Sequence, residues 1–173
     1  QVRPVLTPLG IDPSHPFPQL INKSLNIAVQ LEIKQNNEMR RRFAVVQVPR
    51  VLPRLIKLPR KDSNLDYVFL PNLIGQHLED LFPGTKILGH WQFRITRNSE
   101  LYIDEEDAAN LLKAVEAELH NRRKGDAVRL EVEKDCPSEI RAQLLENFRL
   151  EGDDLYVIDG QLNPTRLMTI YQG

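Results

Sequence analysis

The sequence predicts a single α+β domain with a mostly antiparallel or mixed sheet and about four helices. Two observations support this prediction. Residues 25–33 and 43–48 carry apolar side chains with the period of two that is typical of a strand with one buried face. Further along the chain, segments of strand periodicity are interspersed with segments whose apolar residues recur every three or four positions, as on one helix face. Two strands first and helices afterwards favour α+β over a parallel α/β fold.

Length and composition indicate one soluble domain. The 173 residues suffice for one core, and 41% hydrophobic with 27% charged residues is an ordinary globular composition. A net charge of -1 argues against a surface coated in positive charge for nucleic acid. No run approaches the ~18 apolar residues of a membrane span. The lone Cys136 excludes a disulfide within the chain and fits a reducing compartment. No signal peptide is visible, and the chain begins at Gln1 rather than at methionine. We therefore expect a piece excised from a longer protein.

The N-terminal half is predicted to begin with an extended lead-in, residues 1–23, because its five prolines cannot donate backbone hydrogen bonds. The polar residues 35–37 predict a turn between the first two strands. Residues 66–69 predict a short strand, and Pro71 suits the first turn of a helix that Gly84 ends. That helix would bury one stripe: Leu73, Ile74, His77, Leu78, Leu81 and Phe82.

The C-terminal half is predicted to continue the sheet. Residues 88–97 form a strand with Trp91, Phe93 and Ile95 on one face and His90 on the other. The acidic run 104–107 favours the start of a helix that extends to about Gly125. The remaining elements are a half-buried strand at Val128, Leu130 and Val132, a helix from Pro137 with Ile140, Leu144, Leu145 and Phe148, a strand at 155–158, and a closing helix capped by Asn163.

Catalytic chemistry finds little support in the residues. No glycine-rich phosphate loop and no G-x-S-x-G nucleophile elbow occurs among the 8 glycines. The four histidines, His15, His77, His90 and His120, are not paired at helical ligand spacing, and we interpret His77 as a packed or hydrogen-bonded structural residue. The acidic run is explained by helix capping rather than by metal binding. We therefore predict no catalytic, cofactor-binding or metal-binding residue.

One basic segment is distinctive. Between Lys34 and Lys61 stand nine positive residues and one negative residue, Glu38, so its formal charge is +8 in a chain of net charge -1. One interpretation is a solvated hairpin tip and loop. The other is a surface for a polyanion or for an acidic partner domain. The second hypothesis names Arg40, Arg41, Arg42, Lys57, Arg60 and Lys61.

Several motifs resemble one family. Residues 93–106, FRITRNSELYIDEE, are similar to the F-R-x-T-R-N-x-D/E-L-x-x-D-E-E stretch of the first bacterial family of polyphosphate kinases. Residues 125–133, GDAVRLEVE, match a strand of the same family, and residues 4–9, 12–18 and 24–26 resemble the entry into its head domain. The closing segment agrees at Tyr156, Gly160, Leu162, Asn163, Leu167 and Met168, but departs at Gln161, where the family has proline, and at Pro164, which interrupts the predicted cap.

The resemblance implies a role in a larger enzyme. Such kinases reversibly transfer the terminal phosphate of ATP to inorganic polyphosphate, with magnesium, through a phosphohistidine in later phospholipase-D-like domains. None of the histidines here lies in the H-x-K-x-x-x-x-D signature of those domains, and an N-terminal helical domain is also absent. The resemblance therefore implies that residues 1–173 are an inactive head (middle) domain, which serves dimerisation and packing around the active-site tunnel. ATP and magnesium are implied for the parent enzyme only. The resemblance also implies a cytoplasmic location, and peripheral membrane association of the parent is left open.

The alternative is a free-standing polyanion- or nucleic-acid-binding domain that uses the basic segment. RNA-binding sheets stack bases on exposed aromatic residues. Only 6% of this chain is aromatic, and the strand pattern turns Trp91 and Phe93 toward the core. An autonomous enzyme has the least support, because no nucleophile with a base is visible.

Overall fold

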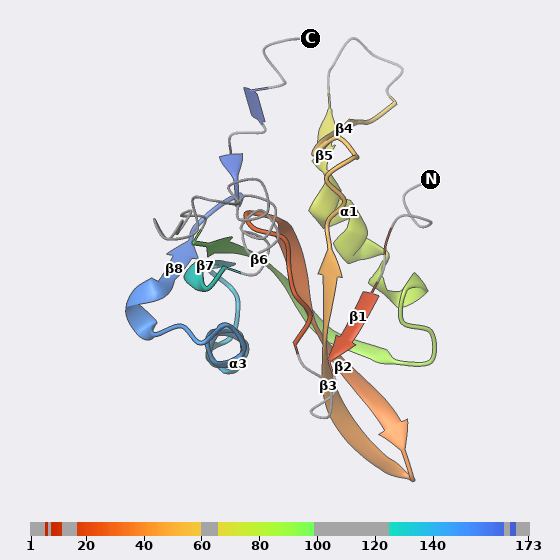
Figure 1. Cartoon of the computed structure of the whole chain (residues 1–173). Helices are drawn as coiled ribbons and strands as arrows, with labels where there is room; N and C mark the ends of the chain where they lie inside the picture. The colour runs from red at the N-terminus through yellow and green to blue at the C-terminus, as the bar shows by residue number, and fades with distance from the viewer. Residues whose placement is uncertain are drawn as a thin grey trace, which may run out of the picture.

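A six-stranded mixed sheet forms the centre of the molecule (Figure 1). The computed structural model describes residues 6, 8–11, 17–59, 66–98, 125–164 and 167–168. In the order of the sheet, its strands are β1 (Pro8–Ile11), β3 (Glu38–Gln47), β2 (Leu25–Gln35), β6 (Lys86–Arg97), β7 (Ala127–Glu133) and β8 (Leu155–Ile158). Neighbours pair antiparallel except β7 with β8. The predicted α+β class with a mixed sheet is therefore confirmed.

Shorter elements complete the described part of the chain. A separate antiparallel pair joins β4 (Leu55–Lys57) to β5 (Tyr67–Phe69). The α-helices are α1 (Leu70–Gln76) and α3 (Ser138–Phe148), and the short 3-10 helices are η2 (Leu78–Asp80) and η4 (Gly152–Asp154). Pro164, Leu167 and Met168 also have 3-10 conformation. Among the described residues, no helix is long and apolar enough to cross a membrane.

The hairpin of β2 and β3 turns where the sequence predicted, at Asn36 and Asn37. Both residues have positive φ, 50° and 65°, as a two-residue primed turn requires, and asparagine tolerates this conformation. Pairing starts at once, with Gln35 opposite Glu38. The returning strand is thus longer than the predicted 43–48, because the tight turn brings residues 38–42 into register.

The sheet is buried on both faces rather than on one. Beneath α3, Phe93, Ile95, Leu130 and Val132 pack against Ile140, Leu144 and Phe148. On the opposite face, the apolar residues of β2 and β3 pack against Leu70, Ile74 and Leu78 of α1 and η2. The prediction of one buried face for β2 was wrong, because Ala28 and Asn26 of its other face are also fully buried. Small side chains there let a second layer pack closely.

The helix count differs from the prediction. The described residues contain two α-helices rather than about four. The helix at Pro71 ends at His77, whose φ of -117° is not helical, and the stripe continues only through η2. The helix predicted from the acidic run 104–107 lies outside the described residues.

The closing helix is not found in the residues that are described there. Asn163 has a φ of 59°, in the left-handed region, whereas a helix N-cap needs extended backbone. No α-helix includes Pro164, Leu167 or Met168.

Other predicted elements are confirmed. Strands β5, β6, β7 and β8 and helix α3 lie where the patterns placed them, with Pro137 at the N-cap of α3. Trp91 packs against the core beneath α3, while His90 lies on the other face, against Gly75. Val128 is the exception in β7, because 46% of it is exposed at the beginning of the strand.

Candidate functional site

The motif strand β6 distributes its residues between the two faces of the sheet. Phe93 and Ile95 are fully buried in the core beneath α3. Arg94 points to the opposite face, as strand alternation requires. A register shift between Thr96 and Arg97 ends the regular pairing with β7. The two arginines therefore enter different environments.

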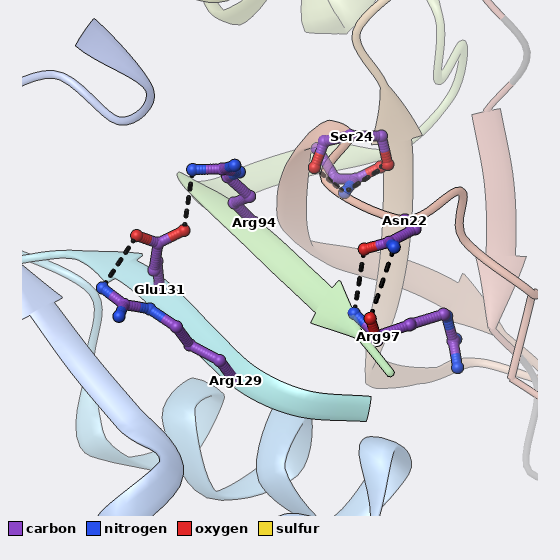
Figure 2. Close-up of polar contacts among 7 residues, drawn as sticks. Asn22, Ser24, Arg94, Arg97, Arg129 and Glu131 are labelled. Atoms are coloured by element: carbon purple, nitrogen blue, oxygen red, sulfur yellow. Dashed lines mark hydrogen bonds and ion pairs between the residues drawn. The ribbon is translucent and has the colours of Figure 1, made fainter. Parts of the chain in front are cut away.

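Arg97 joins three segments of the chain. Its backbone N–H donates to Asn22 Oδ1 at 2.9 Å, and Asn22 Nδ2 donates to the Arg97 carbonyl at 3.3 Å (Figure 2). The guanidinium donates from Nε to the Leu20 carbonyl at 3.2 Å and from Nη1 to the Gly125 carbonyl at 2.9 Å. Burial lowers the pKa of Arg97, although the nearby Asp126 carboxylate opposes this shift. Arg97 thus fastens the lead-in to the ends of β6 and β7.

Arg94 belongs to a charged cluster with Glu131, Arg129 and Tyr156. Arg94 Nη1 lies 3.2 Å from Glu131 Oε2, and Arg129 Nη2 donates to Glu131 Oε1 at 3.1 Å (Figure 2). The Arg129 guanidinium stacks 3.7 Å from the centre of the Tyr156 ring. Only 13% of the Glu131 side chain and 20% of the Arg94 side chain are exposed. One carboxylate is therefore shared by two cations, which leaves a formal charge of about +1 in the cluster.

The cluster has spare hydrogen-bonding capacity. Among the described residues, the buried atoms Arg94 Nε and Glu131 Oε2 have no hydrogen-bond partner. The contact between Arg94 and Glu131 is therefore an ion pair without the geometry of a hydrogen bond. Because its one carboxylate is paired with two arginines, the cluster suits binding or packing.

The basic residues named from the sequence do not gather in one place. Arg40, Arg41 and Arg42 lie in β3, on the part of the hairpin that projects beyond the sheet (Figure 1). Lys57 is exposed on β4, toward the other end of the molecule (Figure 1). Arg60 and Lys61 lie outside the described residues. The arginines of the hairpin and Lys57 of β4 therefore belong to separate basic regions.

The three arginines of β3 are divided between the two faces of the hairpin. The register pairs Arg40 with Ile33, Arg41 with Glu32 and Arg42 with Leu31, so Arg40 and Arg42 share one face and Arg41 the other. Arg40 pairs with Glu38 at 3.1 Å, and Arg42 donates to Gln35 Oε1 at 3.3 Å. Lys34 lies opposite Met39 and adds a cation to the face of Arg41. Each face of the hairpin thus presents two cations.

Among the described residues, neither His77 nor Cys136 has a nucleophilic setting. The His77 side chain is 65% exposed, with Nδ1 3.9 Å from the Asp80 carboxylate, so of the two expected settings, packed or hydrogen-bonded, the packed one is wrong. His15 and His120 lie outside the described residues. Burial raises the pKa of the Cys136 thiol to about 11, against the opposing influence of Arg141, so the thiol stays protonated near neutral pH. The described part of the chain holds no group of three His, Cys, Asp or Glu side chains that could bind a metal ion.

Sequence reasoning missed the cluster around Glu131, although its signal was present. The alternation in 93–97 and 128–132 puts Arg94, Arg129 and Glu131 on the polar side of their strands. What was missing was the pairing of β6 with β7, which sets Arg94 opposite Glu131. Tyr156 could not have been added, because the parallel pairing of β8 joins segments far apart in the sequence.

Comparisons with known proteins agree with the fold. The family model described as "Polyphosphate kinase middle domain" matches residues 1–170. Curated polyphosphate kinases from Pseudomonas aeruginosa and Neisseria gonorrhoeae are 45% and 46% identical over 172 residues, which is 98% of this chain and 25% of each relative. The chain thus spans about a quarter of the length of these relatives.

A solved structure shows the same fold. The crystal structure of the polyphosphate kinase from Porphyromonas gingivalis superimposes with a TM-score of 0.75 and 22% identity, over 98% of this chain and 23% of that one. At this identity the likeness concerns the fold alone. The family match over residues 1–170 is independent of it. The chain therefore belongs to the polyphosphate kinase family and corresponds to its middle domain.

Proposed function

We propose that this chain is the non-catalytic middle module of a polyphosphate kinase, the enzyme that reversibly transfers the terminal phosphate of ATP to inorganic polyphosphate. The observation that carries the proposal is the family match over residues 1–170, together with 45% identity to a curated polyphosphate kinase. In the parent enzyme, the module supports dimerisation and packs around the active-site tunnel. We further propose a cytoplasmic location, in keeping with the single reduced cysteine.

The described residues support a non-catalytic role. Covalent phosphoryl transfer needs a nucleophile with an activating group in reach. Cys136 is buried with a raised pKa, and His77 has only a distant carboxylate beside it. The settings of these two described residues are in keeping with a module that contributes no nucleophile. ATP, magnesium and the phosphorylated histidine belong, in this proposal, to other domains of the parent.

The projecting hairpin is proposed to contact polyphosphate or an acidic face of a neighbouring domain. Arg40 and Arg41 are exposed there, and arginine offers a fork of donors that matches phosphate oxygens. The nucleic-acid alternative is weaker. Trp91 and Phe93 pack against the core, and Tyr156 is covered in part by Arg129, so the described sheet offers little aromatic surface for stacking.

The parent polypeptide provides the test of the proposed enzyme. The purified parent should form acid-insoluble polyphosphate from ATP when magnesium is present. The 173-residue chain alone should form none and should take up no acid-labile phosphate from radiolabelled ATP. Absence of polyphosphate synthesis by a folded parent, or stoichiometric phosphohistidine on the 173-residue chain, would refute the proposal.

A further inference from the structure

An apolar groove of about 380 Å³ lies between the entry into β2 and the end of β3. Leu9 of β1, Ile21, Val48 and Val51 supply its apolar walls. Of its lining residues, Leu9 and Ser24 belong to the segments that carry the family resemblance.

The rim of this groove leaves large apolar side chains in water. Val51 is 82% exposed and Ile21 is 52% exposed, while Val48 on the floor is 2% exposed. Single exposed apolar residues are normal on protein surfaces, but two of them flanking an apolar hollow form a continuous patch. Water contact with this patch is unfavourable, so the groove favours an apolar occupant.

The groove is already formed without an occupant. The Ser24 hydroxyl donates to the Ile21 carbonyl at 2.7 Å, and the Val48 N–H donates to the Leu25 carbonyl at 3.0 Å. The Lys23 N–H donates to the Ile95 carbonyl at 2.9 Å, which anchors this wall to β6. Since the backbone on both sides is held in place, binding would require little ordering of the groove itself.

The charges beside the groove are positive. Arg50 lines it and is exposed, and Lys23 is exposed next to Ile21. The described lining residues include no carboxylate. The complementary occupant is therefore a segment with apolar side chains flanked by Asp or Glu.

We propose that this groove is the docking site for an apolar, acid-flanked segment of the parent polypeptide outside this domain. The proposal rests on the proposed placement of the chain in a longer enzyme, and the chain spans only about a quarter of its curated relatives. A second copy of the same groove is a poorer occupant. Across a two-fold axis, the two positively charged rims would face each other, and like charges in contact are unfavourable.

The accessibility of a thiol at the rim tests the proposal in the full-length parent. In a Val51→Cys variant, the rate of maleimide labelling at position 51 is measured by peptide mass spectrometry in the native and the denatured parent. We expect labelling to be about tenfold slower in the native parent than in the denatured parent. This factor corresponds to a docked state that is about ten times more populated than the open state, because only the open state exposes the thiol. Ile21→Cys, on the opposite rim, provides a second reporter that should be protected likewise.

Charge reversal distinguishes the proposed occupant from others. Adding Lys23→Glu and Arg50→Glu to the Val51→Cys parent should restore fast labelling, because two carboxylates would then face the acidic segment. Equal labelling of native and denatured parent, protection that is lost on dilution, or protection unchanged by charge reversal would each overturn the proposal. Polyphosphate synthesis measured on the same samples reports on the proposed enzyme separately, so the two proposals can fail independently.

Discussion

At the residue scale, the described part of the family motif around β6, residues 93–98, has a structural explanation at several positions. Phe93 and Ile95 fill the core, and Arg97 closes the strand with hydrogen bonds to Leu20 and Gly125. Arg94 points away from that core into the cluster around Glu131. In this described part of the motif, Phe93, Ile95 and Arg97 serve packing and strand closure, while Arg94 reaches a polar cluster that another group could contact.

Arg97→Ala should lower the free energy of unfolding by about 2 kcal/mol, because it leaves the Leu20 and Gly125 carbonyls without their charged donor. Arg97→Lys should recover only part of this loss, since an ammonium group cannot reproduce both directions of the guanidinium fork. Urea unfolding measures the effect. Arg40→Ala, whose side chain is 51% exposed, is the control and should change stability by less than about 0.5 kcal/mol. Equal effects of Arg97→Ala and Arg40→Ala would contradict the proposed role of Arg97.

Cys136 should make stability fall at alkaline pH. Its pKa is raised from 9.0 to about 11 in the folded protein, so the unfolded chain loses this proton first as the pH rises. Stability from this thiol is fully present below pH 9 and is lost between pH 9 and 11, by on the order of 2 kcal/mol. The measurement is the difference in unfolding free energy between the native sequence and Cys136→Ala at several pH values. A difference that stays constant from pH 8 to pH 11 would show that the thiol ionises equally in both states.

At the element scale, the connection into β7 depends on a glycine. A Cβ atom on Gly125 would lie 2.2 Å from the Asn98 carbonyl oxygen. That oxygen belongs to backbone that is held by the Asn98 N–H, which donates to the Asp126 carbonyl at 2.8 Å. The close approach of the two chain segments explains why the GDAVRLEVE motif begins with glycine.

Gly125→Ala should therefore destabilise the domain by about 1–3 kcal/mol, because backbone must move to admit the methyl group. Gly152→Ala is a matched control, since no atom lies within 4 Å of its Cβ position and its φ is not positive. Thermal unfolding of both variants measures the contrast. A Gly125→Ala protein as stable as Gly152→Ala would mean that the two segments are not packed this closely.

At the scale of the whole molecule, the basic segment separates into two regions. The hairpin arginines lie at one end and Lys57 at the other (Figure 1). A formal charge of +8 in the sequence is therefore not one continuous surface. In the proposed contact of the hairpin with polyphosphate, one face would offer Arg40 and Arg42 and the other would offer Lys34 and Arg41.

Replacement of Arg40, Arg41 and Arg42 by alanine in the parent should raise the apparent KM for polyphosphate and leave the KM for ATP nearly unchanged. Polyphosphate affinity should also depend less steeply on salt, because fewer counterions are released on binding. Lys57→Ala, at the other end of the molecule, tests that region separately. Steady-state kinetics at several salt concentrations measure both. An unchanged KM and salt dependence in the triple variant would leave the hairpin as a solvated projection.

The sequence by itself determined the positions of β2, β5, β6, β7 and β8, the Asn36–Asn37 turn, the helix after Pro137 and the family. These features are local, since periodicity, turn residues and motifs are properties of short segments. Tertiary structure decided which segments meet. It buried both faces of β2, ended the first helix at His77 and set Arg94 opposite Glu131. It also separated the hairpin arginines from Lys57. Pairing and packing join residues far apart in the chain, and no local pattern specifies their partners.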